Sequence, residues 1–395
     1  AQFRPIVRSL LETDFYKLTM WQALYNRAPN NIATYSFVCR NTPRIPLATL
    51  CQQINQQLDH LCSLKFTTVE LNYLQSLGHF SQPFLEYLRN FQLNRQFISV
   101  SPLLDGSVSI QAQGPQLSVM QFEIYVLYIV SELHWTAVAH QDPQLYEALL
   151  ASTLERIDTK INWARENLPL DFSFFDFGLR RRASAQVHQY LISKASELPQ
   201  FKGTSNVYEA LLRNLPPIGT MAHEYLQTYQ AMPGVPLPSF QHHALSDWLN
   251  TFHGNLAVAL TDVISMDAFL KTLTPDLARA YTGLRHDSGD PHVWAQKALN
   301  HYIKLGINPL DKKLIFSDGL TFSSALDIHH RWHHKIPCAF GIGTWLTNDS
   351  PVGALNLVMK VVSVNNQPVA KISDAPGKTI CTDQTFIQYL TQACS

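Results

Sequence analysis

The sequence has little that would mark a secreted, membrane-bound or nucleic-acid-binding protein. Its six cysteines are scattered and form no CxxC pair, so neither a disulfide framework nor a cysteine-based zinc cluster is expected. Thirty basic and thirty acidic residues cancel, and no basic tail points to nucleic acid as a partner. The longest apolar run, near IYVLYIV, is too short to span a bilayer, and the first residues lack a signal peptide's apolar stretch. We therefore expect a cytoplasmic protein without a membrane partner.

The chain has 395 residues and 46% hydrophobic content, enough for one large core or two to three smaller domains. Its first part mixes two periodicities. Helical spacing occurs in RSLLETDFYKLTMWQALYNR, in residues 67–91 and in the apolar stretch from Met120 to His134, whereas IATYSFVCRN and FISVSPLLDGSVSIQAQG favour strands. This pattern predicts an N-terminal α+β domain over residues 1–135.

A regular rhythm begins near Phe172. Seven short apolar or β-branched runs end in small or polar residues, and helix-compatible segments separate most of them: FSFFDFG, FKGTSN, PIGTMAHE, NLAVALTD, YTGLRHDSGD, KLIFSDG and CAFGIGT. Alternating strands and helices predict a closed parallel α/β barrel over residues 136–350, irregular in places, with a doubly wound open sheet as the alternative. Residues 351–395 hold two strands around Asn365 and Asn366, which we expect to pack back on the N-terminal domain.

Three familiar motifs are incomplete. The stretch His223-Glu224-Tyr225-Leu226-Gln227 lacks the second histidine of a zinc-protease HExxH helix. The PGKT stretch has Ile372 where a P-loop needs its first glycine, and GIGTWL has Leu346 where a dinucleotide-binding fingerprint needs glycine or alanine. A zinc protease, a P-loop kinase and a Rossmann dehydrogenase are therefore disfavoured.

The densest group of histidines is HHRWHH, with His329, His330, His333 and His334. A spacing of four on a helix places these side chains on neighbouring stripes, where pairs can bind a metal. No carboxylate or cysteine nearby in the sequence completes the set. We interpret the group as a solvated helix face and predict no protein metal site.

Polar residues gather where the predicted strands end, which in a parallel barrel is the catalytic face. RHDSGD offers Arg285, Asp287 and Asp290 together, and opposite charges at one strand end can hold sugar hydroxyls and a phosphate. DFGLRRR places Phe177 and Arg180 after another strand, where an aromatic ring can stack on a planar ring and a guanidinium can bind a carboxylate or phosphate. Together these groups predict a phosphorylated sugar and a planar anion as ligands.

Several motifs, in this order and spacing, resemble those of the nicotinate phosphoribosyltransferases of the bacterial ATP-coupled type: TDFYKLTM, YSFVCRN, DFGLRRR, FKGTSNV, IGTMAHE, GLRHDSGD, IFSDGL, AFGIGT and KISDAPGKT. The resemblance covers nearly the whole chain. It implies the type II phosphoribosyltransferase architecture, an open-faced α+β sandwich domain joined to an irregular TIM-like α/β barrel. It also implies a homodimer with active sites shared between subunits.

The same resemblance implies a reaction that joins nicotinate to the ribose of 5-phosphoribosyl-1-pyrophosphate. The products are nicotinate mononucleotide and pyrophosphate, ATP is hydrolysed alongside, and the product enters NAD salvage. Mg²⁺ is expected to bind through the substrate phosphates rather than in a protein cage. Nicotinamide or quinolinate as the base, or a catalytically dead relative that serves in binding, are the alternatives.

The resemblance also assigns roles to residues. His223 matches the histidine that ATP phosphorylates, near the start of a helix that favours the added charge, and Glu224 is a candidate to orient its ring. Asp287 matches the acid near the ribose and base. The substrate-binding matches are Tyr16, supplied across the dimer, Phe177, Arg180, Thr204, Ser205 and Arg285. The phosphate-binding matches are Lys17, Arg40, Asp318, Gly319, Gly341, Gly343 and Thr344, with Lys360 and Lys371 as weaker ones.

Ser205 separates the resembling family from relatives that use nicotinamide. Those relatives carry an aspartate after the Gly-Thr turn, whereas this chain reads Gly203-Thr204-Ser205. A carboxylate there would repel nicotinate, while a hydroxyl can donate a hydrogen bond to it. Ser205 therefore favours the acid as the substrate.

Overall fold

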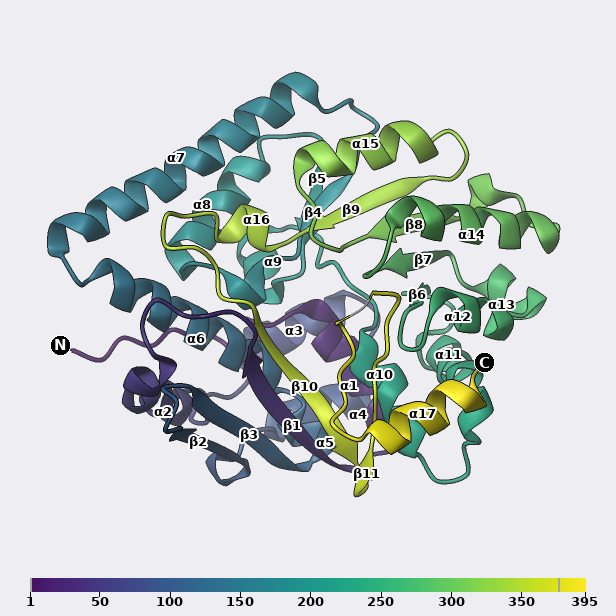
Figure 1. The fold of residues 1–395 in the computed structure, drawn as a ribbon, viewed down its shortest axis with the longest axis horizontal. Helices are drawn as coiled ribbons and strands as arrows, with labels where there is room; N and C mark the ends of the chain where they lie inside the picture. Colours follow the sequence, from purple (N-terminus) through teal and green to yellow (C-terminus); the bar gives the residue numbers. More distant parts are fainter. Residues whose placement is uncertain (1, 376) are drawn as a thin grey trace.

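The computed structural model describes residues 2–375 and 377–395, and Pro376 of the PGKT stretch lies outside the described residues. Two sheets organise the fold (Figure 1). The first is antiparallel and has the order β11-β10-β1-β3-β2. Its strands are β1 (Ile32–Cys39), β2 (Ile98–Pro102), β3 (Val108–Pro115), β10 (Leu357–Val364) and β11 (Gln367–Pro368).

The C-terminal strand β10 lies beside β1 in this sheet, with partners that run from Ala33 and Val364 to Cys39 and Leu357. Asn365 and Asn366 link β10 to β11 and both have positive φ, 51° and 60°. Two left-handed residues in a row are what a tight hairpin turn requires, and asparagine tolerates this conformation. The predicted hairpin is therefore confirmed.

One face of the antiparallel sheet is buried. Ala33, Tyr35 and Phe37 on β1 point into the core, whereas Ile32 and Val38 are each 50% exposed. The N-terminal helices are α1 (Phe15–Arg27), α2 (Cys51–Leu61), α3 (Thr68–Ser76), α4 (Gln82–Asn90), α5 (Gln116–Val119) and α6 (Phe122–Ala139). Helix α6, apolar nearly all round, packs against β10, so the sheet is an open-faced sandwich as predicted.

Helix α1 begins later than the sequence pattern predicted. Asp14 has extended backbone angles, forms a bridge with Asn206, and is followed by Phe15, whose N–H donates to the Ser205 carbonyl. The apolar residues within 8–13 have helical spacing in the sequence, and they are buried in the structure. The segment nevertheless runs extended or in turns toward the barrel. This contact fixes the start of α1, and with it Tyr16, against the barrel.

The second sheet is parallel, with the order β5-β4-β9-β8-β7-β6. Its strands are β4 (Phe174–Asp176), β5 (Phe201–Thr204), β6 (Val258–Leu260), β7 (Gly283–His286), β8 (Lys313–Phe316) and β9 (Cys338–Ile342). The one predicted run that forms no strand, residues 217–220, makes a bridge from Pro217 to Thr204. The Thr220 hydroxyl donates to the Val258 carbonyl at 2.8 Å. This run thereby joins β5 to β6. Pro216 and Pro217 have no N–H to donate to a strand ladder, so this side of the barrel is irregular.

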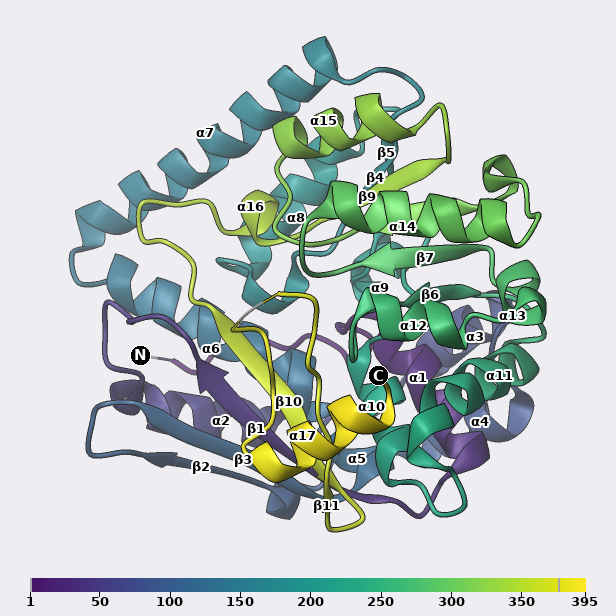
Figure 2. The same ribbon diagram turned by 45° about the vertical axis from the view of Figure 1, so that its right-hand side comes forward.

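Helices cover the outside of the parallel strands, and turning the molecule shows α14 and α15 lying over β7 and β9 (Figure 2). The helices from residue 143 onward are α7 (Pro143–Asn167), α8 (Ala185–Ala195), α9 (Val207–Arg213), α10 (His223–Thr228), α11 (Phe240–Phe252), α12 (Met266–Thr272), α13 (Pro275–Ala280), α14 (Pro291–Lys304), α15 (Phe322–Trp332), α16 (Thr344–Thr347) and α17 (Gln384–Ala393). The predicted irregular α/β barrel is confirmed, while the domain boundaries at residues 135 and 350 stay predictions. Within the described residues, no helix is both long and apolar enough to cross a bilayer.

Candidate active site

A cavity of about 470 Å³ lies where the ends of the barrel strands meet the antiparallel sheet. Four parts of the chain line it: the N-terminal domain, the start of α10, the loops after β4, β7, β8 and β9, and the strand and loop from residue 356 onward. The charged lining residues are the basic Arg40, Arg180, Arg181, Arg285, Lys360, Lys371 and Lys378 and the acidic Glu123, Glu224, Asp287 and Asp318. The excess of basic groups suits this cavity to anionic ligands.

The cations are crowded enough to perturb one another. Burial, followed by the charges of Arg180 and Arg40, lowers the pKa of Arg181 to about 10. Burial is also the main reason that the pKa of Lys360 falls to about 8. Like charges held this close, partly out of water, are costly until an anion binds among them.

His223 is the first residue of α10 and reaches the cavity. Its Nε2–H donates to Asp262 Oδ1 at 2.6 Å, and the Ser288 hydroxyl donates to the other oxygen of Asp262, also at 2.6 Å. With the Nε2 proton held by Asp262, Nδ1 keeps the free lone pair of the neutral ring. The ring is thus oriented by Asp262, which follows β6.

Glu224 points away from His223. One of its oxygens pairs with Lys17 and the other accepts a hydrogen bond from Tyr35 at 2.6 Å. Adjacent residues on a helix project in different directions, which explains why Glu224 and its neighbour do not meet. The group that orients His223 is Asp262 instead.

The protonation state of this pair follows from its surroundings. Burial first, and the charge of Lys371 second, lower the pKa of His223 to about 4 against the opposing effect of Asp262. Burial alone would raise the pKa of Asp262, yet the neighbouring imidazole, Lys371 and Ser288 hold it below its ordinary value. At neutral pH the arrangement is therefore a neutral imidazole beside a carboxylate.

Asp287 and Arg285 come from β7 and the turn that follows it. An oxygen of Asp287 lies 3.8 Å from His223 Nε2. Burial opposes its ionisation, but Arg285 and His223 outweigh this and lower the pKa of Asp287. Arg285 donates to the Met221 carbonyl at 3.0 Å and to the Ser317 hydroxyl at 3.3 Å, which fixes the guanidinium at the cavity wall.

Phe177 and Tyr16 line the cavity in the same chain, together with Arg180 and Arg285. The Arg180 guanidinium lies over the Tyr16 ring, 5.2 Å from its centroid, and its Nε–H donates to Asp14 at 3.1 Å. This chain thus brings its own Tyr16 to its own cavity, and the predicted supply of Tyr16 from a second subunit stays a prediction. One chain brings both aromatic rings and both arginines to one place.

Gly341 does not line the cavity, contrary to its predicted role in phosphate binding. It lies behind Phe177, and a Cβ at this position would come within 2.6 Å of the Phe177 ring. The glycine thus leaves room for the aromatic ring. Gly343 and Thr344 at the end of β9 do reach the cavity.

The loop after β8 forms another part of the wall. Asp318 and Gly319 both line the cavity, and Gly319 has a φ of +59°, a conformation that suits glycine. Asp318 accepts a hydrogen bond from Lys378 Nζ at 2.7 Å. Arg40 completes this region from the end of β1.

Lys17 is placed differently from its prediction as a phosphate ligand. Its side chain is fully buried and does not line the cavity. Nζ pairs with Glu123 at 3.2 Å and also with Glu224. Because this cation neutralises two buried carboxylates, the structure does not bring Lys17 together with the other predicted phosphate-binding residues.

Thr204 and Ser205 are buried and do not line the cavity. The Thr204 hydroxyl donates to Asp176 at 2.7 Å, and the Ser205 hydroxyl donates to Asp14 at 2.6 Å. Because Asp14 also holds Arg180, Ser205 acts on the site through that arginine. The structure therefore does not place these two hydroxyls in the cavity, where the predicted direct contact with the substrate would occur.

Sequence reasoning missed Asp262, Lys378 and Asp14. Asp262 ends the strand run NLAVALTD, so its position at a strand end was a usable signal. Lys378 lies in the PGKT stretch near the C-terminus, which does not form a complete P-loop motif, yet its side chain lines the cavity. Asp14 lies in TDFYKLTM, but nothing local indicates that its partners are Arg180 and Ser205.

Comparisons with known proteins agree with this arrangement. The model of the nicotinate phosphoribosyltransferase (NAPRTase) family matches residues 172–394, and the model of the NAPRTase N-terminal domain matches residues 11–131. The chain is 47% identical over 396 residues to the nicotinate phosphoribosyltransferase of Herminiimonas arsenicoxydans, a match that covers 98% of this chain and 98% of that relative.

Solved structures are similar as well. The nicotinate phosphoribosyltransferase from Vibrio cholerae has a TM-score of 0.88 at 35% identity and covers 98% of this chain and 94% of its own. The one from Porphyromonas gingivalis has a TM-score of 0.90 at 29% identity and covers 98% of this chain and 100% of its own. The two family models, the relative found by sequence and the solved structures all carry the same family name. The chain therefore belongs to the nicotinate phosphoribosyltransferase family.

Proposed function

We propose that this chain transfers the phosphoribosyl group of 5-phosphoribosyl-1-pyrophosphate to nicotinate, a step of NAD salvage, and couples this transfer to ATP hydrolysis through His223. The observation that carries the proposal is the neutral, carboxylate-oriented His223 in a cavity with an excess of cations. Family membership supports the choice of reaction.

The base is bound where Phe177 and Tyr16 meet the arginines. An aromatic wall suits the flat pyridine ring, and the guanidinium of Arg285 suits its carboxylate. Nicotinamide lacks this charge and would leave the guanidinium without an anion, so nicotinate is the favoured base. Quinolinate carries a second carboxylate that has no assigned partner in this arrangement.

The phosphoribosyl group is bound along the loops after β8 and β9. Backbone N–H groups at Gly319 and Gly343 can face its 5-phosphate, with the Thr344 hydroxyl beside them. Arg40, Arg181 and Lys378 also line the cavity and attract the pyrophosphate. The partly exposed carboxylate of Asp287 is a hard oxygen ligand that fits Mg²⁺ held mainly by phosphates, and the ion would supply charge neutralisation for the departing pyrophosphate.

Transfer needs little acid–base chemistry. The pyridine nitrogen already carries a lone pair, and the bond from the ribose to pyrophosphate breaks as charge develops on the ring carbon. The protein holds the nitrogen and the carbon in line, and Asp287 lies where it can stabilise the positive charge.

The coupling step uses His223 as a nucleophile toward the γ-phosphate of ATP. The Nδ1–P bond forms, the bond between the γ-phosphorus and the bridging oxygen breaks, and ADP leaves with that oxygen's electron pair. Asp262 accepts the Nε2–H hydrogen bond throughout and stabilises the charge that develops on the ring. Water then attacks the phosphorus, the Nδ1–P bond breaks with its electron pair returning to Nδ1, and inorganic phosphate leaves the neutral ring.

The homodimer that the family resemblance implies remains part of the proposal, and one chain alone already supplies all the groups named above. The cytoplasm is the compartment that we propose, since ATP and NAD salvage both belong there.

The proposal is tested by supplying the purified chain with 5-phosphoribosyl-1-pyrophosphate, Mg²⁺ and one of three bases, each with and without ATP. We expect nicotinate mononucleotide to form from nicotinate, faster with ATP, and little product from nicotinamide or quinolinate. Consumption of nicotinamide in preference to nicotinate would contradict the assigned substrate. Equal rates with and without ATP would contradict the coupling.

A further inference from the structure

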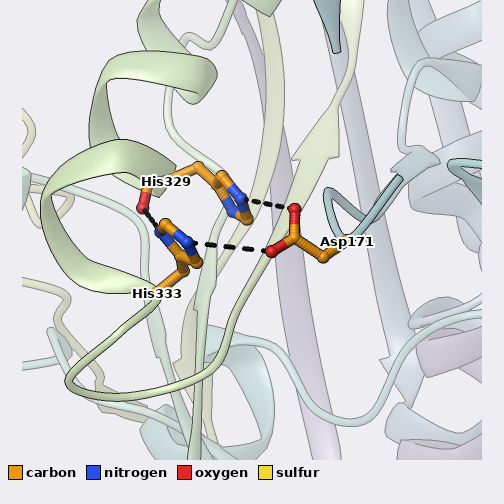
Figure 3. Close-up of side chains that lie close together, drawn as sticks. All are labelled: Asp171, His329 and His333. Carbon is orange, nitrogen blue, oxygen red and sulfur yellow. Dashed lines mark hydrogen bonds and ion pairs between the residues drawn. The ribbon is translucent and has the colours of Figure 1, made fainter. Parts of the chain in front are cut away.

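The histidines of HHRWHH meet a carboxylate that is distant in the sequence. Asp171 lies 158 residues before His329, in the segment that leads into β4, and its side chain reaches the end of α15 (Figure 3). His329 Nε2 is 3.2 Å from Asp171 Oδ1, and His333 Nε2 is 3.7 Å from Asp171 Oδ2. The fold thus supplies the carboxylate whose absence from the nearby sequence led to the interpretation of a solvated helix face.

The hydrogen bond between His333 Nδ1 and the His329 carbonyl determines which ring nitrogen of His333 can bind a metal ion. Its Nδ1 lies 2.6 Å from the His329 carbonyl oxygen, and a carbonyl oxygen only accepts, so Nδ1 carries a proton. In the neutral ring Nε2 then has a lone pair, and this lone pair faces a carboxylate oxygen. Two acceptors that face each other need a cation or a proton between them. A ring N–H bound to a backbone carbonyl is also the usual support of a metal-binding histidine.

His329 presents the same edge to Asp171. The two imidazole rings are stacked, with centroids 4.1 Å apart and planes inclined by 9°, and Figure 3 shows both rings facing the carboxylate. His329 is buried, and its Nδ1 has no hydrogen-bond partner among residues 2–375 and 377–395. A proton can therefore move from Nε2 to Nδ1 without breaking another hydrogen bond on that side.

We propose that Asp171, His329 and His333 bind one divalent transition-metal ion of the Zn²⁺ type. The three ligand atoms lie within 4.8 Å of one another. Ligand atoms at ordinary bond lengths around a tetrahedral zinc ion are about 3.3 Å apart, so the two measured separations need only small adjustments. Two imidazoles and one carboxylate suit Zn²⁺, Co²⁺ or Ni²⁺ better than Mg²⁺ or Ca²⁺, which prefer oxygen ligands. Asp171 is 64% exposed, which leaves room for water as a further ligand.

The position of the site indicates a structural role. None of the three residues lines the catalytic cavity. Asp171 precedes β4, whose far end leads to Phe177, and α15 follows the loop that contains Gly319 and ends at Trp332. A bound ion would tie the start of β4 to the end of α15, on the side away from the substrates. We expect it to raise thermal stability and to leave the transfer rate unchanged.

The test is Zn²⁺ binding to the chelator-treated full chain, followed by calorimetry and by metal analysis after dialysis. Co²⁺ serves as a second probe, because its visible spectrum reports ligand number and geometry. We expect one equivalent of Zn²⁺ that binds at least about tenfold more weakly in Asp171→Asn and in His333→Ala. Zn²⁺ should also raise the melting temperature of the wild type by a few degrees and that of Asp171→Asn much less.

The matched control is His330→Ala, which removes an exposed histidine next to the cluster on the same helix. It should bind Zn²⁺ as the wild type does. Because His223, Asp262 and Asp287 form another group that could hold an ion, each variant is also measured with His223→Ala in the background. The proposal is overturned if the wild type binds no Zn²⁺, if either Asp171→Asn or His333→Ala binds it unchanged, or if His330→Ala loses it equally. Asp171→Asn is close in shape to the wild type and largely exposed, so it keeps the test valid if His333→Ala fails to fold.

Discussion

His223 Nε2 lies 2.6 Å from Asp262 Oδ1, and the Ser288 hydroxyl holds the second oxygen of the same carboxylate. The three residues come from three separate segments, α10, the loop after β6 and the turn after β7. This chain of hydrogen bonds fixes one nitrogen of the imidazole as a donor and leaves the other as a nucleophile. Phosphorylation of His223 by ATP depends on this arrangement.

Replacing Asp262 by asparagine keeps the shape of the side chain but removes its charge. An amide can present its N–H₂ to Nε2, which favours the wrong tautomer, and the charge on the ring is no longer stabilised. We expect phosphorylation of His223 by ATP to slow at least about a hundredfold, as when the acid of a catalytic triad is replaced. Ser288→Ala removes only one neutral hydrogen bond and should cost less than about tenfold. Equal effects of the two substitutions, in single-turnover ATP cleavage, would show that Asp262 does not act through its charge.

The pH dependence follows from the lowered pKa of His223. An ordinary histidine with a pKa of about 6.5 would be about 90% protonated at pH 5.5 and would lose its nucleophile. With a pKa of about 4 in the folded chain, the ring stays neutral as the pH falls and is protonated only near pH 4. The initial rate of phosphoenzyme formation should therefore change less than about twofold between pH 7 and pH 5.5. A tenfold fall over that range would mean that the ring titrates normally.

A complete site within one chain predicts the absence of complementation. Tyr16 and His223 line the same cavity of the same chain. When the Tyr16→Ala and His223→Ala proteins are unfolded, mixed and refolded together, every site still lacks one of the two groups. We expect no coupled activity above the sum of the two variants refolded separately. A clear gain in the mixture would show that the site is shared between subunits.

Discrimination between nicotinate and nicotinamide should depend on Arg285 and not directly on Ser205. Ser205→Ala removes one hydrogen bond to Asp14, worth about 0.5–1.5 kcal/mol, so both bases should lose efficiency by a similar factor of at most about tenfold. Arg285→Gln removes the cation, and the ratio of kcat/KM for nicotinate over nicotinamide should fall about tenfold to a hundredfold. The assignment of Arg285 fails if Ser205→Ala changes the ratio and Arg285→Gln does not.

The elements that sequence reasoning predicted well are those set by local pattern. Strand runs such as KLIFSDG and CAFGIGT became β8 and β9, and Asn365 and Asn366 became the turn. Their periodicity and turn chemistry depend on a few neighbouring residues. The start of α1 was misjudged because Asp14 is held extended by Ser205, 191 residues away.

Individual side chains were harder to predict because their partners are distant in sequence. The resemblance indicated His223, Phe177, Arg180 and Arg285 for the site, and the structure brings all four to one cavity. It could not indicate that Lys17 would form ion pairs with two buried carboxylates, since Glu123 and Glu224 come from other helices.

The histidine cluster shows the same limit. Its carboxylate, Asp171, becomes a neighbour only once β4 and α15 lie side by side.

The most direct test of the central claim is the position of phosphate on the chain after incubation with Mg²⁺ and ATP labelled at the γ-phosphate. We expect one labelled residue, His223, with a bond that is labile in acid and stable in base because protonation of the nitrogen makes it a leaving group. His223→Ala should carry no label and should lose the stimulation of transfer by ATP. Label that persists in His223→Ala, or that maps to another residue of the wild type, would contradict the account.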